Sequence, residues 1–432
     1  MSRKQHPPEP PAGAGAAPPM AVVYADLHIH LGGIKMAAAR DLTVENILAE
    51  SAGRKGLGMV GIIDAAAPPA LARLRELARA GELEELSGGG LRYRDRLTLI
   101  PGSEVEVWHP GPGSTGPFHL LVYLPGLREL EEFARWQATQ VKNPCLSTQR
   151  HRASAAEVVA VAAELGGFVV PAHAFTPYKG ILAAAGSVSA AIPPELWPHV
   201  PAVELGLSAD TEMADRLPEL QAFAYVANSD AHSLPRIARE YNALAVVAPT
   251  FRELRLALRE AEGRAVLAHY GQDPRLGKYH RSYCLTCDRP LEGPPPQAAC
   301  PRDPGHRLVL GVLDRVHLLA AAGGEPLGTP ATHQEPPVTP RPATHQAPRA
   351  RRRRPPYVHQ IPLAFVPGVG RRTLDRLLAA FGSEMAVLHR ATREELAEVV
   401  GPALAERIDA ARRGAVAIAS GAGGIYGRLV LD

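Results

Sequence analysis

Short apolar runs alternate with amphipathic stretches between residue 21 and about residue 270 of the chain. The runs predict buried β-strands, and the stretches between them have the spacing of helices with one apolar face. Strands alternating with helices favour parallel βαβ units, and seven or eight units favour a closed barrel over an open sheet. The candidate strands are 22–26, 59–64, 97–106, 119–123, 167–171, 202–205, 224–229 and 243–247.

The pattern changes outside this region. Residues 1–20 are rich in Pro and Ala, which predicts a disordered extension and not a signal peptide. Residues 276–318 form a short segment that contains three of the four cysteines. Residues 319–356 are of low complexity, repeat Pro-Ala-Thr-His-Gln and end in arginines, so we expect a flexible linker. Helical periodicity returns in residues 357–432.

Composition narrows the class of protein. A hydrophobic content of 46% supports a sizeable core, and no run approaches the ~20 apolar residues of a membrane-spanning helix. The formal net charge is only +3, with the positive charge concentrated in the C-terminal third. The cysteine usage suits a reducing compartment better than a disulfide framework. We therefore expect a cytoplasmic protein with two or three domains.

Histidines and acidic residues follow the predicted strands repeatedly. His28 and His30 end one apolar run, and Asp230 and His232 end another. Residues i and i+2 of a strand point to the same side, so each pair projects together. Other candidate strands also carry imidazole or carboxylate groups towards their ends, namely Asp64, Glu104, His119, His173 and Glu204.

These groups favour a metal centre at one end of the barrel. Functional side chains of such barrels gather at the C-terminal ends of the strands. Imidazoles with carboxylates suit zinc, manganese or iron, and paired ions promote phosphoryl transfer to water. The pattern therefore predicts a metal-dependent hydrolase, although any one of these histidines alone could be a core residue.

The cysteine segment has the spacing of a zinc-binding module. Two residues separate Cys284 from Cys287, and Cys300 follows after twelve more. A second Cys-x2-Cys pair would need a cysteine where Asp303 stands, so His306 is the preferred fourth ligand and Asp303 the alternative. We expect one structural zinc ion; three buried thiols are the other interpretation.

A Val-Pro-Gly-Val-Gly string before an amphipathic stretch is typical of a helix-hairpin-helix. Gly368 and Gly370 permit a tight turn, and the amides of the following helix can bind a DNA phosphate without reading sequence. Arg371 and Arg372 add positive charge there. A helical hairpin used for protein contacts is the alternative.

Several strings resemble the PHP (polymerase and histidinol phosphatase) domain and, more narrowly, the endonuclease Q family, which nicks DNA at deaminated bases. The resemblance runs from about residue 22 to the end. Its strings are Asp-Leu-His-Ile-His at 26–30, Gly-Ser-Glu at 102–104, His-Leu-Leu-Val-Tyr at 119–123, Pro-Ala-His at 171–173, Ala-His-Ala-Phe-Thr-Pro at 172–177, Glu-Leu-Gly-Leu-Ser-Ala-Asp at 204–210 and Asn-Ser-Asp-Ala-His at 228–232.

The resemblance implies a distorted (β/α)7 PHP barrel as the catalytic domain at 21–275. A small zinc-binding module at 276–318 and a helical helix-hairpin-helix domain at 357–432 would follow. It also implies two or three divalent ions in the barrel, zinc with or without magnesium or manganese. DNA carrying a lesion would be the partner, and no membrane would be involved.

The same resemblance assigns the ligands. His28, His30, Glu104 and Asp230 would hold one ion, and Glu104 would bridge to a second ion held with His119 and His173. Asp64 and His232 would help to hold a third. Asp230, Glu104 and His173 would be the catalytic residues.

This sequence departs from the pattern of many PHP proteins at two places, and both concern the third ion. No His follows Asp64, which precedes three alanines, and none follows His30, where the sequence continues Leu-Gly-Gly-Ile-Lys. Lys35 and Arg40 could contact phosphate instead, or be solvated charges.

The expected activity is hydrolysis of the phosphodiester 5′ to uracil, hypoxanthine, xanthine or an abasic site by metal-activated water. Phe175, Tyr178 and Trp108 are aromatic candidates for a base pocket, and each could equally be core. The alternatives are a PHP-type phosphoesterase acting on a small phosphomonoester and a catalytically inactive DNA-binding protein.

Overall fold

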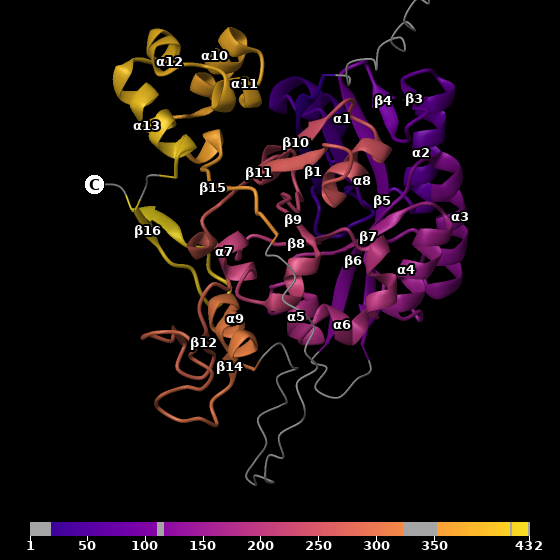
Figure 1. The fold of residues 1–432 in the computed structure, drawn as a ribbon. Coiled ribbons are helices and arrows are strands. Elements are labelled where there is room, and N and C mark those ends of the chain that lie inside the picture. Colours follow the sequence, from indigo (N-terminus) through magenta and orange to yellow (C-terminus); the bar gives the residue numbers. More distant parts are fainter. Residues whose placement is uncertain (1–18, 110–115, 323–351, 415–416, 431–432) are drawn as a thin grey trace, which may run out of the picture.

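The computed structural model describes residues 19–109, 116–322, 352–414 and 417–430 (Figure 1). Most of the predicted N-terminal extension, and residues 323–351 of the predicted linker, lie outside these ranges. Each of the eight predicted strands is present. The strands up to residue 271 are β1 (Ala21–Ile29), β2 (Met59–Ile62), β3 (Leu83–Glu85), β4 (Leu91–Tyr93), β5 (Leu97–Trp108), β6 (Pro117–Tyr123), β7 (Phe168–Pro171), β8 (Ala202–Glu204), β9 (Ala224–Val226), β10 (Tyr241–Val246) and β11 (Ala265–Gly271).

A closed ring of strands forms the barrel. β1, β2 and β5 pair in parallel, β6 is antiparallel to both β5 and β7, and β8 is parallel to β9. Between β7 and β8, the N–H of Ala174 donates to the carbonyl of Glu204 (2.9 Å). Ala231, which follows β9, pairs with Ile29 of β1. The ring β1, β2, β5, β6, β7, β8 and β9 is the distorted PHP barrel that the resemblance implies.

The prediction of uniformly parallel βαβ units is wrong for β6 and also for β10, which pairs antiparallel with β1. The described residues between β5 and β6 contain no crossover helix, and strands joined by a short connection pair antiparallel. β6 therefore begins at the end of the barrel where β5 finishes. This reversal decides where His119, near the start of β6, is placed.

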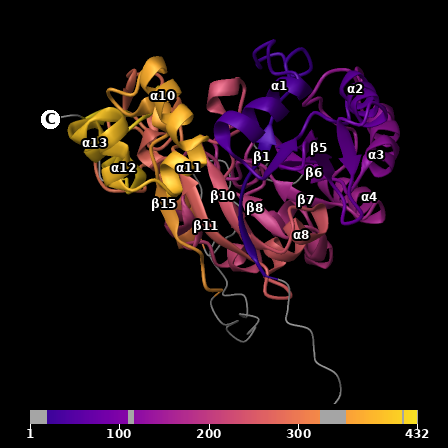
Figure 2. The same cartoon turned by 90° about the horizontal axis from the view of Figure 1, so that it is seen from above.

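Helices cover the outside of the barrel, and the sheet extends from β1 through β10 and β11 (Figure 2). α4 begins at Ser154 with a capping box closed by Glu157, and its apolar face is buried. The α-helices up to residue 259 are α1 (Val44–Ala49), α2 (Pro68–Arg79), α3 (Leu127–Gln140), α4 (Ala155–Glu164), α5 (Ile181–Ala184), α6 (Val188–Ala191), α7 (Thr211–Ala214) and α8 (Phe251–Arg259).

Apolar side chains from successive strands fill the barrel interior. Leu27, Leu121, Tyr123, Val170 and Val226 belong to one buried cluster, as expected for inward positions of barrel strands. A larger cluster lies between the strands and the covering helices. The packed interior leaves only the end of the barrel for a site.

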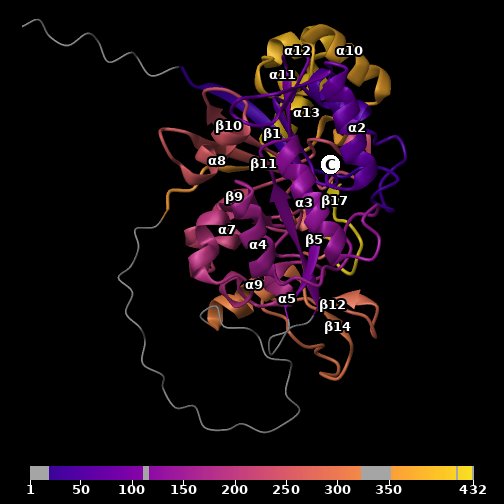
Figure 3. The same ribbon diagram turned by 90° about the vertical axis from the view of Figure 1, so that its right-hand side faces the viewer.

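Two smaller units flank one side of the barrel at opposite ends (Figures 1 and 3). One contains the cysteines, and the other is the C-terminal helical unit. A hairpin after the helices returns towards the cysteine unit (Figure 1). The elements of these units are β12 (Tyr283–Cys284), β13 (Arg289–Pro290), β14 (Leu308–Val309), α9 (Val312–Ala321), β15 (Tyr357–His359), α10 (Arg371–Phe381), α11 (Glu384–His389), α12 (Arg393–Val400), α13 (Pro402–Arg412), β16 (Ala417–Ala419) and β17 (Arg428–Val430).

Both ends of the predicted linker are ordered where the structure describes them. α9 continues to Ala321, and β15 adds in parallel to β11. The guanidinium of Arg354 donates to the carbonyls of Phe223 (2.6 Å) and Leu220 (2.9 Å) and lies over the ring of Tyr225. This arginine therefore anchors the chain to the barrel and is not part of a free basic tail.

Across the ranges that the structure describes, no helix is long and apolar enough to cross a membrane.

Candidate metal centre

His28 and His30 present their Nε2 atoms to the end of the barrel because carboxylates hold their other ring nitrogens. The Nδ1–H of His28 donates to Glu204 (3.0 Å to Oε1), and that of His30 donates to Asp64 (3.1 Å to Oδ2). Such carboxylate–histidine pairs fix the tautomer and the orientation of metal-ligating imidazoles. Both rings are buried.

Asp230 and Glu104 complete a set of donor atoms around these nitrogens. Oδ1 of Asp230 lies 3.5 Å from Nε2 of His28 and 3.4 Å from Nε2 of His30. Oε1 of Glu104 lies 3.6 Å from the first nitrogen, and its Oε2 lies 3.8 Å from the second. Ligands about 2.1 Å from a tetrahedral ion are about 3.4 Å apart, so the spacing fits one ion.

Glu104 also belongs to a second group of potential ligands. Its Oε1 lies 2.8 Å from Nδ1 of His119 and 3.6 Å from Nε2 of His173. His119 reaches this place because β6 runs antiparallel to β5. As the third residue of β6, His119 lies beside Glu106 of β5. Glu104 therefore lies between two sets of ligand atoms. The ligand atoms of His28, His30 and Asp230 lie within 4.8 Å of one another, and so do those of Glu104, His119 and His173.

Two of these residues have unusual backbone conformations. His173 and Asp230 have positive φ angles of 30° and 46°, a region that side chains other than Gly rarely adopt. Gly206 leaves room for the side chain of His173, because a Cβ at Gly206 would lie 2.8 Å from the Cβ of His173. Such strain persists where the surrounding structure fixes it, commonly at functional sites.

The polar atoms at this centre fit divalent cations. Nε2 of His28 and of His30 is buried without a hydrogen-bond partner in the described part of the chain. Four carboxylates, those of Asp64, Glu104, Glu204 and Asp230, lie around the two rings. Lys35 is the one lysine or arginine of the described ranges within 4.0 Å of any of them. Three of these carboxylates are buried, and such a concentration of negative charge is costly unless cations offset it.

The pKa values reflect this concentration of charge. Burial opposes the charged form of His28, but the carboxylates of Glu204, Asp230 and Glu104 raise its pKa to about 10. Burial also opposes ionisation of Glu104, yet His119 and Lys35 hold its pKa well below the usual range. The donor set therefore keeps its carboxylates ionised, as metal binding requires.

Asp64 and His232 are placed differently from the ligands above. The oxygens of Asp64 accept from the N–H of Leu31 (2.8 Å), the hydroxyl of Ser147 and the ring of His30. His232 lies with its ring 4.6 Å from that of His30, and its Nδ1 is 3.0 Å from the carbonyl of Asp230. Within the described ranges, neither residue belongs to a group with the geometry of a third metal site.

A cavity of about 280 Å³ opens beside the two ligand groups. Tyr178, Tyr279, Lys179 and Tyr426 line it together with Glu104 and the two histidines of the second group. Tyr178 packs edge-on against Tyr279, with ring centroids 5.5 Å apart. Of the other aromatic candidates, Phe175 is buried in the core, while Trp108 is exposed beneath the guanidinium of Arg150.

Sequence reasoning missed several polar residues at this centre. Thr148 donates to Oε2 of Glu104 (2.6 Å), and its neighbour Ser147 donates to Asp64. These residues stand in an irregular loop, which gives no periodic signal. Glu106 pairs with Lys179 and could have been found, because it lies two residues from Glu104 on the same face of β5.

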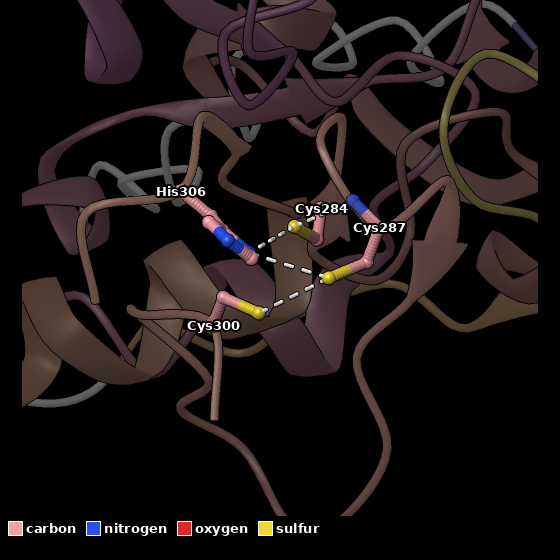
Figure 4. A group of neighbouring side chains, drawn as sticks. All are labelled: Cys284, Cys287, Cys300 and His306. Carbon is pink, nitrogen blue, oxygen red and sulfur yellow. Dashed lines mark hydrogen bonds between the residues drawn. The ribbon is translucent and has the colours of Figure 1, made fainter. Parts of the chain in front are cut away.

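The cysteine module brings Cys284, Cys287, Cys300 and His306 together (Figure 4). Sγ of Cys287 lies 3.3 Å from Nδ1 of His306 and 3.8 Å from Sγ of Cys300. Ligands at Zn–S and Zn–N distances of about 2.3 and 2.1 Å would have this separation. The backbone N–H groups of Asp303 and Arg302 lower the pKa of Cys300 to about 6, which favours the thiolate.

In the C-terminal unit, the turn at Gly368 and Gly370 leads from a short 3-10 helix, Leu363–Phe365, into α10. Gly368 has a φ of 95°, and Gly370 is the N-cap of α10. Arg371 and Arg372, in the first turn of α10, are exposed. A similar turn at Gly401, with a φ of 86°, joins α12 to α13, and a Cβ at Gly368 would lie 3.1 Å from Leu404 of α13. The two turns therefore belong to one compact unit.

Comparisons with known proteins extend over nearly the whole chain. No protein-family model matches it. The chain is 39% identical over 418 residues to the uncharacterized protein YqxK of Bacillus subtilis (strain 168), which covers 95% of this chain and 100% of that protein.

Two solved structures are similar in both fold and sequence. The first is the crystal structure of the novel lesion-specific endonuclease PfuEndoQ from Pyrococcus furiosus, with 29% identity, a TM-score of 0.75 and 95% coverage of each chain. The second is Endonuclease Q in complex with a 27-mer duplex substrate that has an abasic lesion at the active site. It has 29% identity and a TM-score of 0.74 and covers 95% of this chain and 97% of that one.

Proposed function

Because this chain belongs to the endonuclease Q family, we propose that it is a metal-dependent DNA endonuclease that acts at damaged nucleotides. The observation that carries the proposal is the pair of ligand groups that meet at Glu104. Paired divalent ions can stabilise both the attacking and the leaving oxygen of a phosphodiester. The duplex with an abasic lesion at the active site of a similar protein supports damaged DNA as the substrate.

The bond to be cut is the phosphodiester 5′ to a deaminated base (uracil, hypoxanthine or xanthine) or to an abasic site. The oxygen of a water molecule would join phosphorus, the P–O3′ bond would break, and the 3′ oxygen would take a proton. The products would be a 3′-hydroxyl and a lesion nucleotide that carries the 5′-phosphate.

The ligand assignment follows the geometry. His28, His30, Asp230 and Glu104 would hold one ion, and Glu104 with His119 and His173 would hold the other. Ions bound there, zinc with or without magnesium or manganese, would lower the pKa of a water ligand and offset charge on the phosphate.

The protein's own side chains supply rigidity at the reacting centre. Asp230, Glu104 and His173 are the residues that we assign as catalytic, because they face the cavity and the proposed ions at once. Glu204 fixes His28 and also accepts the N–H of His173 (2.7 Å). One buried carboxylate therefore holds a residue of each ligand group in position.

The cavity beside the metal groups suits an extrahelical nucleotide. Its volume of about 280 Å³ and the exposed ring of Tyr178 are appropriate for a flat base. A damaged or missing base is easier to displace from the duplex than a paired one, and this difference would contribute to selectivity.

The remaining units would hold DNA and maintain the fold. The hairpin at Gly368 and Gly370, with Arg371 and Arg372, would bind the phosphate backbone without reading sequence. The ion of Cys284, Cys287, Cys300 and His306 would be structural. The proposed domains are a catalytic domain at 21–275, a zinc-binding module at 276–318, a linker at 319–356 and a DNA-binding domain at 357–432.

A nicking assay with varied metals tests the proposal. Duplexes that carry uracil, hypoxanthine or an abasic site should be nicked by the native protein, whereas Asp230→Ala should lose nicking while keeping its fold. Glu164→Ala, which removes an exposed carboxylate at the end of α4, is the matched control and should retain full activity.

Two results would contradict the proposal. Hydrolysis of a small phosphomonoester without nicking would indicate a small-molecule phosphoesterase. DNA binding without any hydrolysis in the presence of bound metal would indicate an inactive DNA-binding protein.

A further inference from the structure

Lys35 is a cation in the metal cavity that is not a metal ligand. Its Nζ lies 2.8 Å from Oε2 of Glu104 and also donates to the hydroxyl of Thr148. The side chain is 17% exposed and lines the same cavity as His119 and Asp230. An ammonium group therefore stands next to the carboxylate that connects the two ligand groups.

The loop after His30 holds Lys35 in this place. The N–H of Lys35 donates to the carbonyl of Leu31 (2.9 Å), and its own carbonyl accepts from Ala38 (3.0 Å). Gly32 is required in the loop, because a Cβ there would lie 2.1 Å from the carbonyl oxygen of Ala39. The backbone that presents the lysine is thus fixed.

Both oxygens of the neighbouring Asp64 carboxylate already accept hydrogen bonds. These hydrogen bonds come from Leu31, Ser147 and His30. The carboxylate therefore positions His30 and links the segment after His30 to the loop that contains Ser147. In the part of the chain that the structure describes, the barrel holds two groups with metal-ligand geometry, and Asp64 is in neither. The positive charge next to Oε2 of Glu104 comes from Lys35.

Resting on the proposed function, we propose that Lys35 replaces a third metal ion in this enzyme. Its ammonium contacts Glu104 and a non-bridging oxygen of the scissile phosphate, and the barrel holds two ions. A lysine ammonium has three donors. Glu104 and Thr148 use two of them, and the third remains for the phosphate.

The chemistry of lysine suits this role. The ammonium is a compact point charge that needs no ligand set, unlike a divalent ion. A fixed donor aimed at charge that develops in the transition state acts mainly on the rate of the chemical step. Lys35 should therefore affect kcat more than the affinity for DNA.

Counting ions tests the placement of Lys35 without any substrate. The native protein and Lys35→Met should each carry two ions in the barrel and one in the cysteine module, measured by elemental analysis after dialysis against zinc or manganese. A third ion in the barrel of the native protein, or two barrel ions reduced to one in Lys35→Met, would overturn the proposal.

Single-turnover cleavage of a uracil duplex tests the catalytic role. Lys35→Met should lower the rate of cleavage about 100-fold, while its Kd for the duplex changes by less than about threefold and raised metal concentrations do not restore the rate. Lys35→Arg should recover part of the rate. Lys142→Met, at an exposed lysine, is the control and should match the native protein.

Other results would show a different role for Lys35. Cleavage by Lys35→Met within about threefold of the native rate would exclude phosphate contact. Recovery at high metal concentration would show that Lys35 only supports metal binding. If the native protein cuts no lesion duplex, the proposed function fails, and hydrolysis of bis(p-nitrophenyl) phosphate with the ion count still tests Lys35 separately.

Discussion

Lys55 and Glu384 form a buried ion pair that joins the barrel to the C-terminal helices. Nζ of Lys55 lies 2.9 Å from Oε1 of Glu384, and the two side chains are 5% and 7% exposed. The same Nζ donates to the carbonyl of Pro235 (3.3 Å), three residues after His232. The helical unit is therefore fixed relative to the loop that carries the metal-site residues.

Breaking this pair should destabilise the protein strongly. Glu384→Gln leaves the Lys55 charge buried without its partner, which typically costs about 3–5 kcal/mol. The free energy of unfolding in urea measures the change. Arg54→Met breaks the partly exposed neighbouring pair with Asp375 and should cost less than about 1 kcal/mol. Equal effects of the two variants would contradict a buried role for Lys55.

A neutral histidine at the same interface should make stability depend on pH. His389 of α11 stacks on Tyr24 of β1 with centroids 4.4 Å apart, and its Nε2 lies 2.7 Å from the hydroxyl of Tyr241. Burial, with Arg412 and Arg390, lowers its pKa to about 4. The unfolded chain, with a pKa of about 6.5, binds the proton more readily, so stability is lost as pH falls from about 6.5 towards 4.

The size of this effect can be measured on a variant. Between pH 7.5 and 5.5, His389 should account for about 1.3 kcal/mol of lost stability. His389→Phe keeps an aromatic ring and should lose that share of the pH dependence. Tyr241→Phe keeps the histidine and should retain it. Identical slopes for His389→Phe and the native protein would show that His389 does not stay neutral in the fold.

How far the sequence predicts this site depends on the kind of element involved. The i, i+2 rule places His28 and His30 together, and each of the eight predicted strands is present. The rule cannot show that β6 is reversed, which is what brings His119 to Glu104. The loop contact of Thr148 and the anchoring of Arg354 depend on tertiary packing that no local pattern encodes.

Glu204 should control metal affinity although it is not proposed as a ligand. It holds Nδ1 of His28 and accepts from Asn228 (2.8 Å). Glu204→Gln keeps the shape but can offer His28 one acceptor without charge. We expect metal affinity to fall about 10–100-fold, as for other residues that support ligating histidines. Competition with a chelator measures it, and Glu164→Ala is the control. Unchanged affinity would show that Glu204 does not orient His28.

The cysteine module should distinguish His306 from Asp303 as the fourth ligand. Nδ1 of His306 faces the sulfurs, whereas Asp303 lies on the other side of the ring, with Oδ2 3.7 Å from Nε2. His306→Ala should lose the zinc ion of the module on mild chelation, and Asp303→Ala should retain it. The release of zinc, followed with a coloured chelator, decides between them. The opposite result would make Asp303 the ligand.

Arg371 and Arg372 should contribute to DNA affinity without changing lesion choice. Both are exposed in the first turn of α10, where the amides after Gly370 are directed at a phosphate in the proposed complex. Replacing both with Ala removes at most two phosphate contacts, so the slope of log K against log salt should become shallower by about 0.9 per contact.

The same double substitution distinguishes a role in DNA binding from a role in cleavage. Cleavage at saturating protein should stay near the native rate for uracil and abasic duplexes alike, because a backbone contact carries no information about the base. Arg393→Ala, at an exposed arginine that begins α12, is the matched control and should leave the salt slope unchanged. An unchanged slope for the double variant would show that the turn at Gly368 and Gly370 does not contact DNA. The turn at Gly401, which precedes α13 in the same unit, would then be the next surface to test for DNA contact.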